Sequence, residues 1–141
     1  MAREILADTG FWVALFYPPD GHYSQARNTW RQVVRERWPT ATTNWTIYET
    51  LTLFNCRFHR HDLAVRVLDF VSRWSQIIRI EEAQLEGRSL EIFRSHPDKR
   101  WSVVDCANFA CIESRQCEFA LAYDRSFEQA QLEFSFRLLK P

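Results

Sequence analysis

The sequence predicts an α/β fold, a three-layer α/β/α sandwich with a central, mainly parallel sheet. Short apolar runs alternate along the chain with longer amphipathic segments, an order typical of parallel strands joined by crossover helices. A length of 141 residues, of which 46% are hydrophobic, suits one core. Without any repeat or linker in the sequence, we expect a single domain over residues 1–141.

The first elements follow from apolar spacing and from breaking residues. Ile5–Ala7 is an apolar run that stops at a polar turn, as a buried strand does. Phe11–Phe16 predicts a brief helix, which two following prolines end. From His22 onward apolar residues recur at helical spacing, so a second helix should pack one face on the core and end before Pro39.

The middle of the chain predicts a strand and two helices. Thr40–Thr43 is rich in β-branched residues and predicts the strand. Thr46 and Glu49 have the spacing of a capping box, so the next helix should begin at Thr46. A further helix is expected over Asp62–Trp74, where apolar residues form one stripe.

The next segments repeat this order. Gln76–Ile80 is a strand-sized apolar run, and Glu81-Glu82 should begin a helix with negative charge at its positive end. A loop is expected at residues 96–100. Ser102 and Asp105 again have capping-box spacing, and the small residues after them predict a helix that lies close to the sheet.

The last segments complete the alternation. Phe119–Tyr123 predicts a buried strand, Ser126–Gln131 a short helix, and Phe134–Leu139 a final strand.

Charge and cysteine content limit the class of protein. The 18 basic and 18 acidic residues give a net charge of zero, so any nucleic acid must be held by local groups and not by a global positive field. The four cysteines lack zinc-type spacing, which favours reduced thiols in the cytosol. The sequence contains neither a signal peptide nor a membrane-spanning run, so we expect a cytoplasmic protein without membrane contact.

Four acidic residues stand at the ends of predicted strands or the starts of predicted helices: Asp8, Glu49, Asp105 and Asp124. In an open parallel sheet such positions lie at one edge, where functional groups gather. Four carboxylates in one pocket repel each other unless a cation binds, and hard oxygen ligands favour Mg²⁺ or Mn²⁺. Metal-bound water and metal charge are what phosphodiester hydrolysis requires. Each acid has an alternative interpretation as a helix cap.

The segments that carry these acids resemble the PIN domain family, and within it the VapC-type toxins of bacterial toxin-antitoxin pairs. The resemblance covers the whole chain and is carried by four segments: Ile5–Thr9, Thr46–Glu49, Ser102–Ala107 and Ala122–Phe127. It implies that Asp8 and Asp105 are the central metal ligands, with Glu49 and Asp124 completing or supporting the shell. It also implies an RNA substrate, inhibition of translation, silencing by a cognate antitoxin protein, and a homodimer.

Polar neighbours of these acids are further candidates. Thr9 and Ser102 supply hydroxyl groups that can orient a ligand or water, although Ser102 also suits a helix cap. Basic residues near the acids can hold RNA phosphates or can simply be solvated: Arg57, Arg60, Lys99, Arg100 and Arg125.

Two other classes of function are weighed against the nuclease. A phosphatase of the haloacid-dehalogenase type has a second Asp two places after the first, where this chain has Gly10. A response-regulator receiver has a Lys at a late strand end, but Lys140 is nearly terminal. The remaining alternative is a catalytically inactive PIN domain that acts as an RNA-binding or protein-interaction module.

Overall fold

Five short strands pair into one sheet in the computed structural model, which describes residues 4–139. The sheet is parallel throughout, in the order β3-β2-β1-β4-β5. Ile5 in the central strand lies opposite Thr40 on one side and Phe119 on the other. The strands are β1 (Ile5–Ala7), β2 (Thr40–Thr43), β3 (Gln76–Ile78), β4 (Phe119–Leu121) and β5 (Arg137–Leu138).

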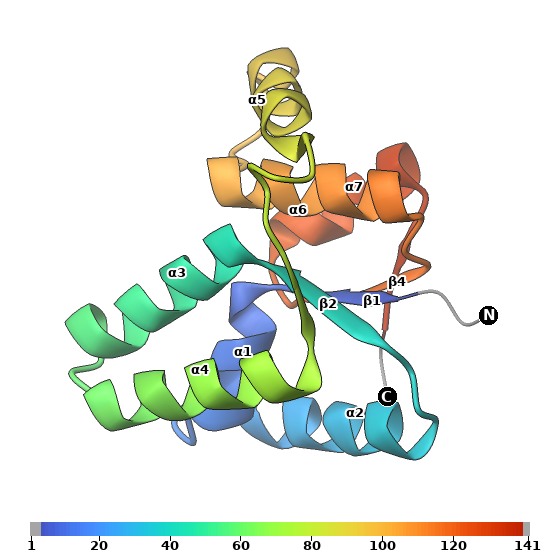
Figure 1. Ribbon diagram of the computed structural model, residues 1–141. Helices are drawn as coiled ribbons and strands as arrows, with labels where there is room; N and C mark the ends of the chain where they lie inside the picture. The colour runs from blue at the N-terminus through green and yellow to red at the C-terminus, as the bar shows by residue number, and fades with distance from the viewer. Residues whose placement is uncertain (1–3, 140–141) are drawn as a thin grey trace.

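Helices cover both faces of the sheet, which confirms the predicted α/β class (Figure 1). Within residues 4–139 they are α1 (Thr9–Phe16), α2 (Tyr23–Arg35), α3 (Asn44–Thr52), the π-helical turn η1 (Leu53–Arg57), α4 (His61–Trp74), α5 (Leu85–Ser95), α6 (Val103–Arg115) and α7 (Arg125–Phe134). Helices α1, α2 and α4 lie on one face, and α6 and α7 lie on the other. Helix α5 packs on α6 and projects away from the sheet.

Alternating side chains of β1 supply both hydrophobic cores. Leu6 packs with residues of α5, α6 and α7, whereas Ile5 and Ala7 pack with residues of α1, α2 and α4. Successive side chains of a strand point to opposite faces, so the middle strand of a covered sheet is apolar at every position. This explains why the short run Ile5–Ala7 is fully buried and why the residue that follows it lies at the sheet edge.

Helix α3 begins earlier than the sequence predicted. It starts at Asn44, and its cap is the Thr43 hydroxyl, which accepts a hydrogen bond from the Thr46 backbone N–H at 3.0 Å. Thr46 is therefore inside the helix, and Glu49 lies in the second turn. The predicted capping box between Thr46 and Glu49 is wrong because an equally spaced hydroxyl three residues earlier takes that role.

The segment after β3 also differs from the prediction. The strand ends at Ile78 and not at Ile80, because the Ile80 N–H donates to Asn44 Oδ1 at 2.9 Å. Glu81-Glu82 lies in a turn and does not begin a helix; α5 starts at Leu85. The Glu81 carboxylate instead accepts hydrogen bonds from the side chains of Asn44 and Trp45, which ties this turn to the start of α3.

At the C-terminal end the last helix is longer, and the last strand shorter, than the sequence predicted. The predicted short helix extends to Phe134, and the predicted last strand contracts to Arg137–Leu138. Phe127, Ala130 and Phe134 are the buried face of α7, at helical spacing. Phe134 therefore ends a helix where a strand was expected to begin, and β4 ends two residues earlier than predicted, at Leu121.

The cysteine thiols and the helix lengths can be described within residues 4–139. All four thiols are free, three of them buried and Cys56 exposed. Burial raises the pKa of Cys106 to about 11 and that of Cys111 to about 12, so both stay protonated. No helix within residues 4–139 has the length and apolar character needed to cross a bilayer.

Candidate metal centre

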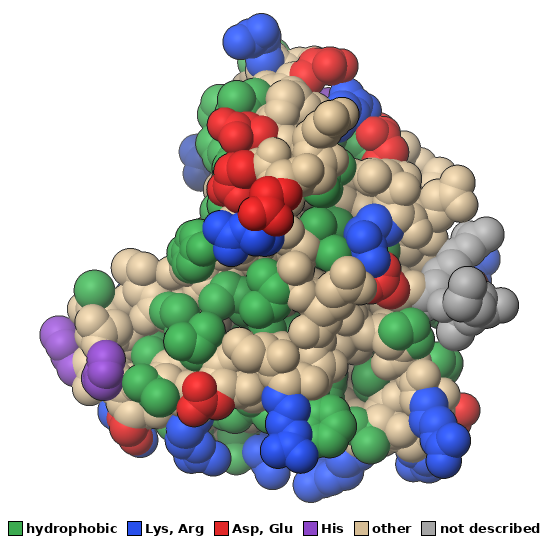
Figure 2. Space-filling view, in the orientation of Figure 1, with side chains coloured by type: hydrophobic (Ala, Val, Ile, Leu, Met, Phe, Trp, Pro, Cys, Tyr) green, Lys and Arg blue, Asp and Glu red, His purple; other side chains and the backbone are tan. Residues whose placement is uncertain are grey.

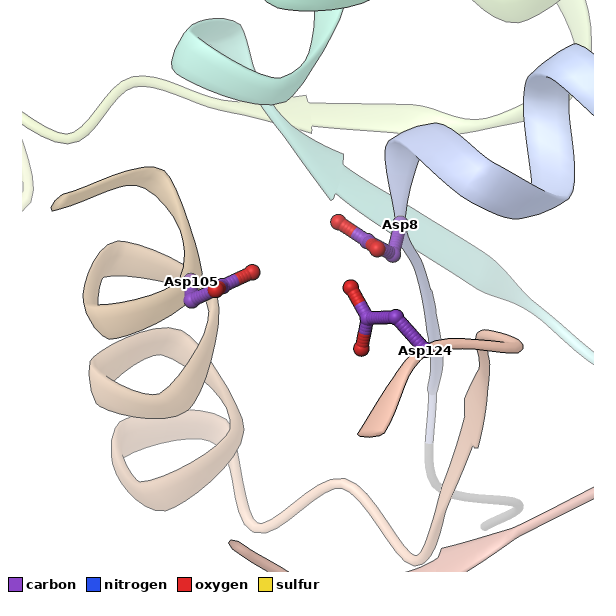
Figure 3. A group of neighbouring side chains, drawn as sticks. All are labelled: Asp8, Asp105 and Asp124. Atoms are coloured by element: carbon purple, nitrogen blue, oxygen red, sulfur yellow. The ribbon is translucent and has the colours of Figure 1, made fainter. Parts of the chain in front are cut away.

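Three aspartates from three different elements meet at the carboxyl edge of the sheet (Figure 3). Asp8 follows β1 directly, Asp105 lies in the first turn of α6, and Asp124 precedes α7. One carboxylate oxygen from each side chain lies within 4.8 Å of the corresponding oxygens of the other two. Parallel strands β1 and β4 are neighbours, so the residues that follow them reach the same edge.

Asp8 is held by a hydrogen bond from the interior of the protein. It occupies the cap position of α1, but its side chain makes no capping hydrogen bond. Its Oδ1 accepts instead from Asn108 Nδ2 at 3.0 Å, and the side chain is 4% exposed. The interpretation of this carboxylate as a helix cap is therefore wrong, and its orientation is set toward the other two aspartates.

Asp105 and Asp124 combine a capping role with a place in the cluster. The Ser102 N–H donates to Asp105 Oδ2, and the Asp105 N–H donates to Ser102 Oγ, both at 3.0 Å. This confirms the capping box predicted at the start of α6. Asp124 Oδ1 accepts from the Phe127 N–H at 3.1 Å. Since a carboxylate has two oxygens, capping leaves each of these side chains one oxygen for a further ligand.

The cluster stores electrostatic repulsion. Burial, reinforced by the charges of Asp124 and Asp105, raises the pKa of Asp8 well above its ordinary value. Burial, together with the charge of Asp105, raises the pKa of Asp124 to about 6. Within residues 4–139 no Lys or Arg forms an ion pair with any of the three. A cation from solution is therefore the group that would relieve this repulsion.

The donor set fits a hard divalent cation. All three side chains offer carboxylate oxygens, which are the ligands that hard ions such as Mg²⁺ prefer. One oxygen of each side chain already lies within 4.8 Å of those of the other two, so the three face one common position. The acidic cluster is thus suited to holding a metal ion that keeps several of its waters.

Glu49 stands at the rim and is not one of the three converging acids. Its side chain is exposed, on the second turn of α3. Burial and the charge of Asp105 raise its pKa, while the Thr9 hydroxyl opposes the shift. Thr9 is itself buried, and Thr50 Oγ1 donates to its hydroxyl at 3.3 Å.

The basic residues singled out from the sequence divide into paired and unpaired groups. Arg60 forms an ion pair with Asp62 at 2.9 Å, and Lys99 forms one with Asp98 at 3.4 Å. The other three are exposed and have no ion pair within the described part of the chain: Arg57, Arg100 and Arg125. Of these, Arg125 directly follows Asp124 in the sequence.

Sequence reasoning missed Asn108, which connects the cluster to α3. Asn108 is fully buried; its amide donates to Asp8, and its Oδ1 accepts from Thr46 Oγ1 at 3.0 Å. Thr46 is in turn held by the capping residue Thr43. The available signal was a lone amide on the helix face lined by Ala and Cys, because a polar side chain at such a position needs buried partners.

Replacing Asn108 by alanine is expected to weaken metal binding about 10- to 100-fold, as removal of a group that orients a metal ligand usually does. Asp8 would lose the only side-chain donor it has within residues 4–139, and the Thr46 hydroxyl would lose its acceptor. Titration of Mn²⁺ followed by calorimetry measures the change. Thr29→Ala, a buried hydroxyl in α2, is the matched control. Equal affinity for Mn²⁺ in Asn108→Ala and the wild type would show that the Asp8 carboxylate does not need Asn108 for its orientation.

Two known proteins are similar to this chain in sequence. The 23S rRNA-specific endonucleases VapC20 of Mycobacterium tuberculosis strains CDC 1551 / Oshkosh and ATCC 25618 / H37Rv are each 32% identical to this chain over 130 residues. The match covers 89% of this chain and 93% of each relative. No protein-family profile matches the chain.

A solved structure agrees in fold over nearly the full length. The crystal structure of Mycobacterium tuberculosis VapC20, described as a Sarcin-Ricin loop cleaving toxin, superposes with a TM-score of 0.85 at 27% identity. The superposition covers 98% of this chain and 100% of the VapC20 chain. The order of elements that brings the three aspartates together is therefore the order found in a nuclease toxin.

Proposed function

Because the chain belongs to the VapC family of PIN-domain ribonucleases, we propose that it is a Mg²⁺-dependent endoribonuclease whose catalytic residues are Asp8, Glu49, Asp105 and Asp124. The observation that supports this proposal most strongly is the convergence of three carboxylates that form no ion pair with a Lys or Arg among residues 4–139. Retention of such a cluster costs stability in the absence of a cation. A module that only binds RNA or protein would lose this stability without gaining a metal site.

The proposed roles follow from position. Asp8 and Asp105 hold the ion, and Asn108 keeps the Asp8 carboxylate turned toward it. When bound, Mg²⁺ or Mn²⁺ supplies charge stabilisation for the phosphate and lowers the pKa of a bound water. Asp124 or Glu49 accepts a proton from the attacking water and orients it. The Thr9 hydroxyl lies beside α3, where Thr50 Oγ1 donates to it, and the Ser102 hydroxyl keeps the start of α6, and with it Asp105, fixed.

The proposed substrate is a structured segment of ribosomal RNA. VapC20 is described as specific for 23S rRNA and as cleaving the Sarcin-Ricin loop. The sequence identity to this relative over nearly the whole chain supports the same class of RNA here, and cleavage there would inhibit translation. Arg57, Arg60, Lys99, Arg100 and Arg125 are the proposed phosphate contacts near the site.

The proposed biological setting is a toxin-antitoxin pair in the cytoplasm. The chain would act as a single domain over residues 1–141, of which 1–3 and 140–141 lie outside the described residues, as a homodimer silenced by a cognate antitoxin. Exposed apolar surface supports binding of protein partners: Tyr48 is 51% exposed beside an open cleft of about 800 Å³ that Leu53 and Val104 also line.

A cleavage assay tests this function directly. A labelled hairpin RNA with the Sarcin-Ricin loop sequence should be cut once in Mg²⁺ or Mn²⁺, and excess EDTA should stop the reaction until metal is restored. RNA binding without cutting under any of these metal conditions would instead support the inactive PIN module. A scrambled hairpin of equal length reports whether the cut depends on sequence.

A further inference from the structure

Helix α2 presents an unusual run of arginines. Its sequence contains no acidic residue, and Arg27, Arg31 and Arg35 recur at four-residue intervals, which places them on one face. Helix α4 adds Arg66 beside them. Basic side chains accordingly gather along the lower edge of the molecule in Figure 2, over α2 and α4. In a chain of zero net charge this is a strong local excess.

Three of these arginines surround one pocket. Arg27, Arg31 and Arg66 line a cavity of about 280 Å³. The remainder of its lining is apolar or aromatic: Leu15, Phe16, Trp30 and Phe70. All three arginines are exposed, and none has an ion pair within residues 4–139. We call Arg27, Arg31 and Arg66 the arginine pocket.

The arginine pocket has the chemistry of a polyanion site. Guanidinium groups form forked hydrogen bonds with phosphate oxygens, and aromatic faces accept stacked bases. Arg31 Nη1 donates to the neutral Asn28 Oδ1 at 2.8 Å, and the Arg27 guanidinium carbon lies 5.3 Å from the centre of the Tyr23 ring. These contacts position the side chains without neutralising their charge, so an incoming phosphate displaces no carboxylate.

The arginine pocket is also placed within reach of the acidic cluster. Helix α1 begins directly after Asp8 and ends at Phe16, which lines the pocket. Eight helical residues span about 12 Å. The acidic cluster repels RNA and the chain has no net charge, so the affinity for a folded RNA has to come from cations outside the cluster.

We propose that Arg27, Arg31 and Arg66 form an exosite that binds the phosphate backbone of the RNA substrate at a distance from the bond that is cut. The inference rests on the proposed function, because that function supplies RNA as the polyanion. An exosite contributes equally to the ground state and the transition state, so its loss should raise KM and leave kcat unchanged.

The test compares two doubly substituted proteins of equal charge. The first is Arg31→Ala with Arg66→Ala; the control is Arg94→Ala with Arg137→Ala, which removes two exposed arginines from α5 and β5. Binding of the hairpin RNA is measured by fluorescence anisotropy in EDTA, so that the RNA stays intact. We expect about tenfold weaker binding for the pocket variant and a salt slope smaller by about 1.4 to 1.8, corresponding to two lost phosphate contacts.

Cleavage kinetics separate this exosite from the proposed activity. In Mg²⁺ the pocket variant should show a KM raised about tenfold with unchanged kcat, whereas the control should match the wild type. Equal salt slopes and equal KM in the two double variants would overturn the exosite. So would intact RNA binding together with lost binding of an acidic peptide, which would assign the pocket to a protein partner. A wild type that binds RNA through the pocket without cutting it would instead refute the nuclease and leave the exosite standing.

Discussion

Replacing Asp8 by asparagine is expected to abolish metal-dependent RNA cleavage while making the metal-free protein more stable. Asparagine has nearly the same shape and can still accept the hydrogen bond from Asn108, but it removes one of the two charges proposed to hold the ion. We expect cleavage to fall about 1,000-fold or more, equivalent to about 4 kcal/mol of lost transition-state stabilisation.

Most substitutions of a buried residue destabilise the folded protein. Asp8→Asn is expected to stabilise it. Burial and the charges of Asp124 and Asp105 disfavour ionised Asp8 in the folded protein, and the neutral amide removes that penalty. The melting temperature in EDTA should therefore rise by several degrees, since about 1 kcal/mol corresponds to about 2–4 °C in a chain of this size. Glu118→Gln, which neutralises an exposed acid before β4, is the control and should change neither quantity. A lower melting temperature would mean that the ionised Asp8 carboxylate stabilises the folded protein in spite of its burial.

Sequence alone could predict the features that depend on neighbouring residues. The capping box of Ser102 and Asp105 joins groups three residues apart, so its spacing is visible in the sequence and the structure confirms it. The central strand β1 could be predicted in the same way, because a strand that is buried on both faces has consecutive apolar residues. The two acids that follow β1 and β4 could then be placed at one edge by the general rule for parallel sheets.

Long-range contacts explain what the sequence could not predict. Asn108 contacts Asp8 across 100 positions, and no local pattern reports such a pair. Glu81 has helix-start chemistry, yet it serves as an acceptor for Asn44 and Trp45, which only the fold brings near. Tertiary hydrogen bonds outweigh local propensity in that segment.

Two other errors came from competing local signals. Thr43 and Thr46 both have a side chain suited to capping, and the earlier residue is the cap because it is the last residue of β2 and α3 begins directly after it. The aromatic residues after Gln131 suggested a strand, although the 127, 130 and 134 spacing is helical. In both cases the sequence also contains the pattern that the structure follows.

Metal binding should depend steeply on pH near 6. Burial and the charge of Asp105 raise the pKa of Asp124 to about 6 from an ordinary value of 3.8, so a proton competes with the ion below that pH. The sign for the metal-free protein is the reverse. A carboxyl whose pKa is raised on folding gives its full stability below the unfolded pKa and loses it as pH rises through the folded one. Added Mn²⁺ should therefore raise the melting temperature strongly at pH 8 and weakly at pH 5.

The difference between melting temperatures with and without Mn²⁺ is the quantity to follow from pH 5 to pH 8. The pKa of His96 is raised in spite of partial burial, because Ile92 O and Glu133 accept hydrogen bonds from its ring. Its contribution is the same with and without metal, so the difference cancels it. Asp124→Asn should flatten the profile and weaken binding at pH 8. A profile for Asp124→Asn with the wild-type midpoint would assign the titration to another carboxyl and show that the charge of Asp124 does not act on the ion.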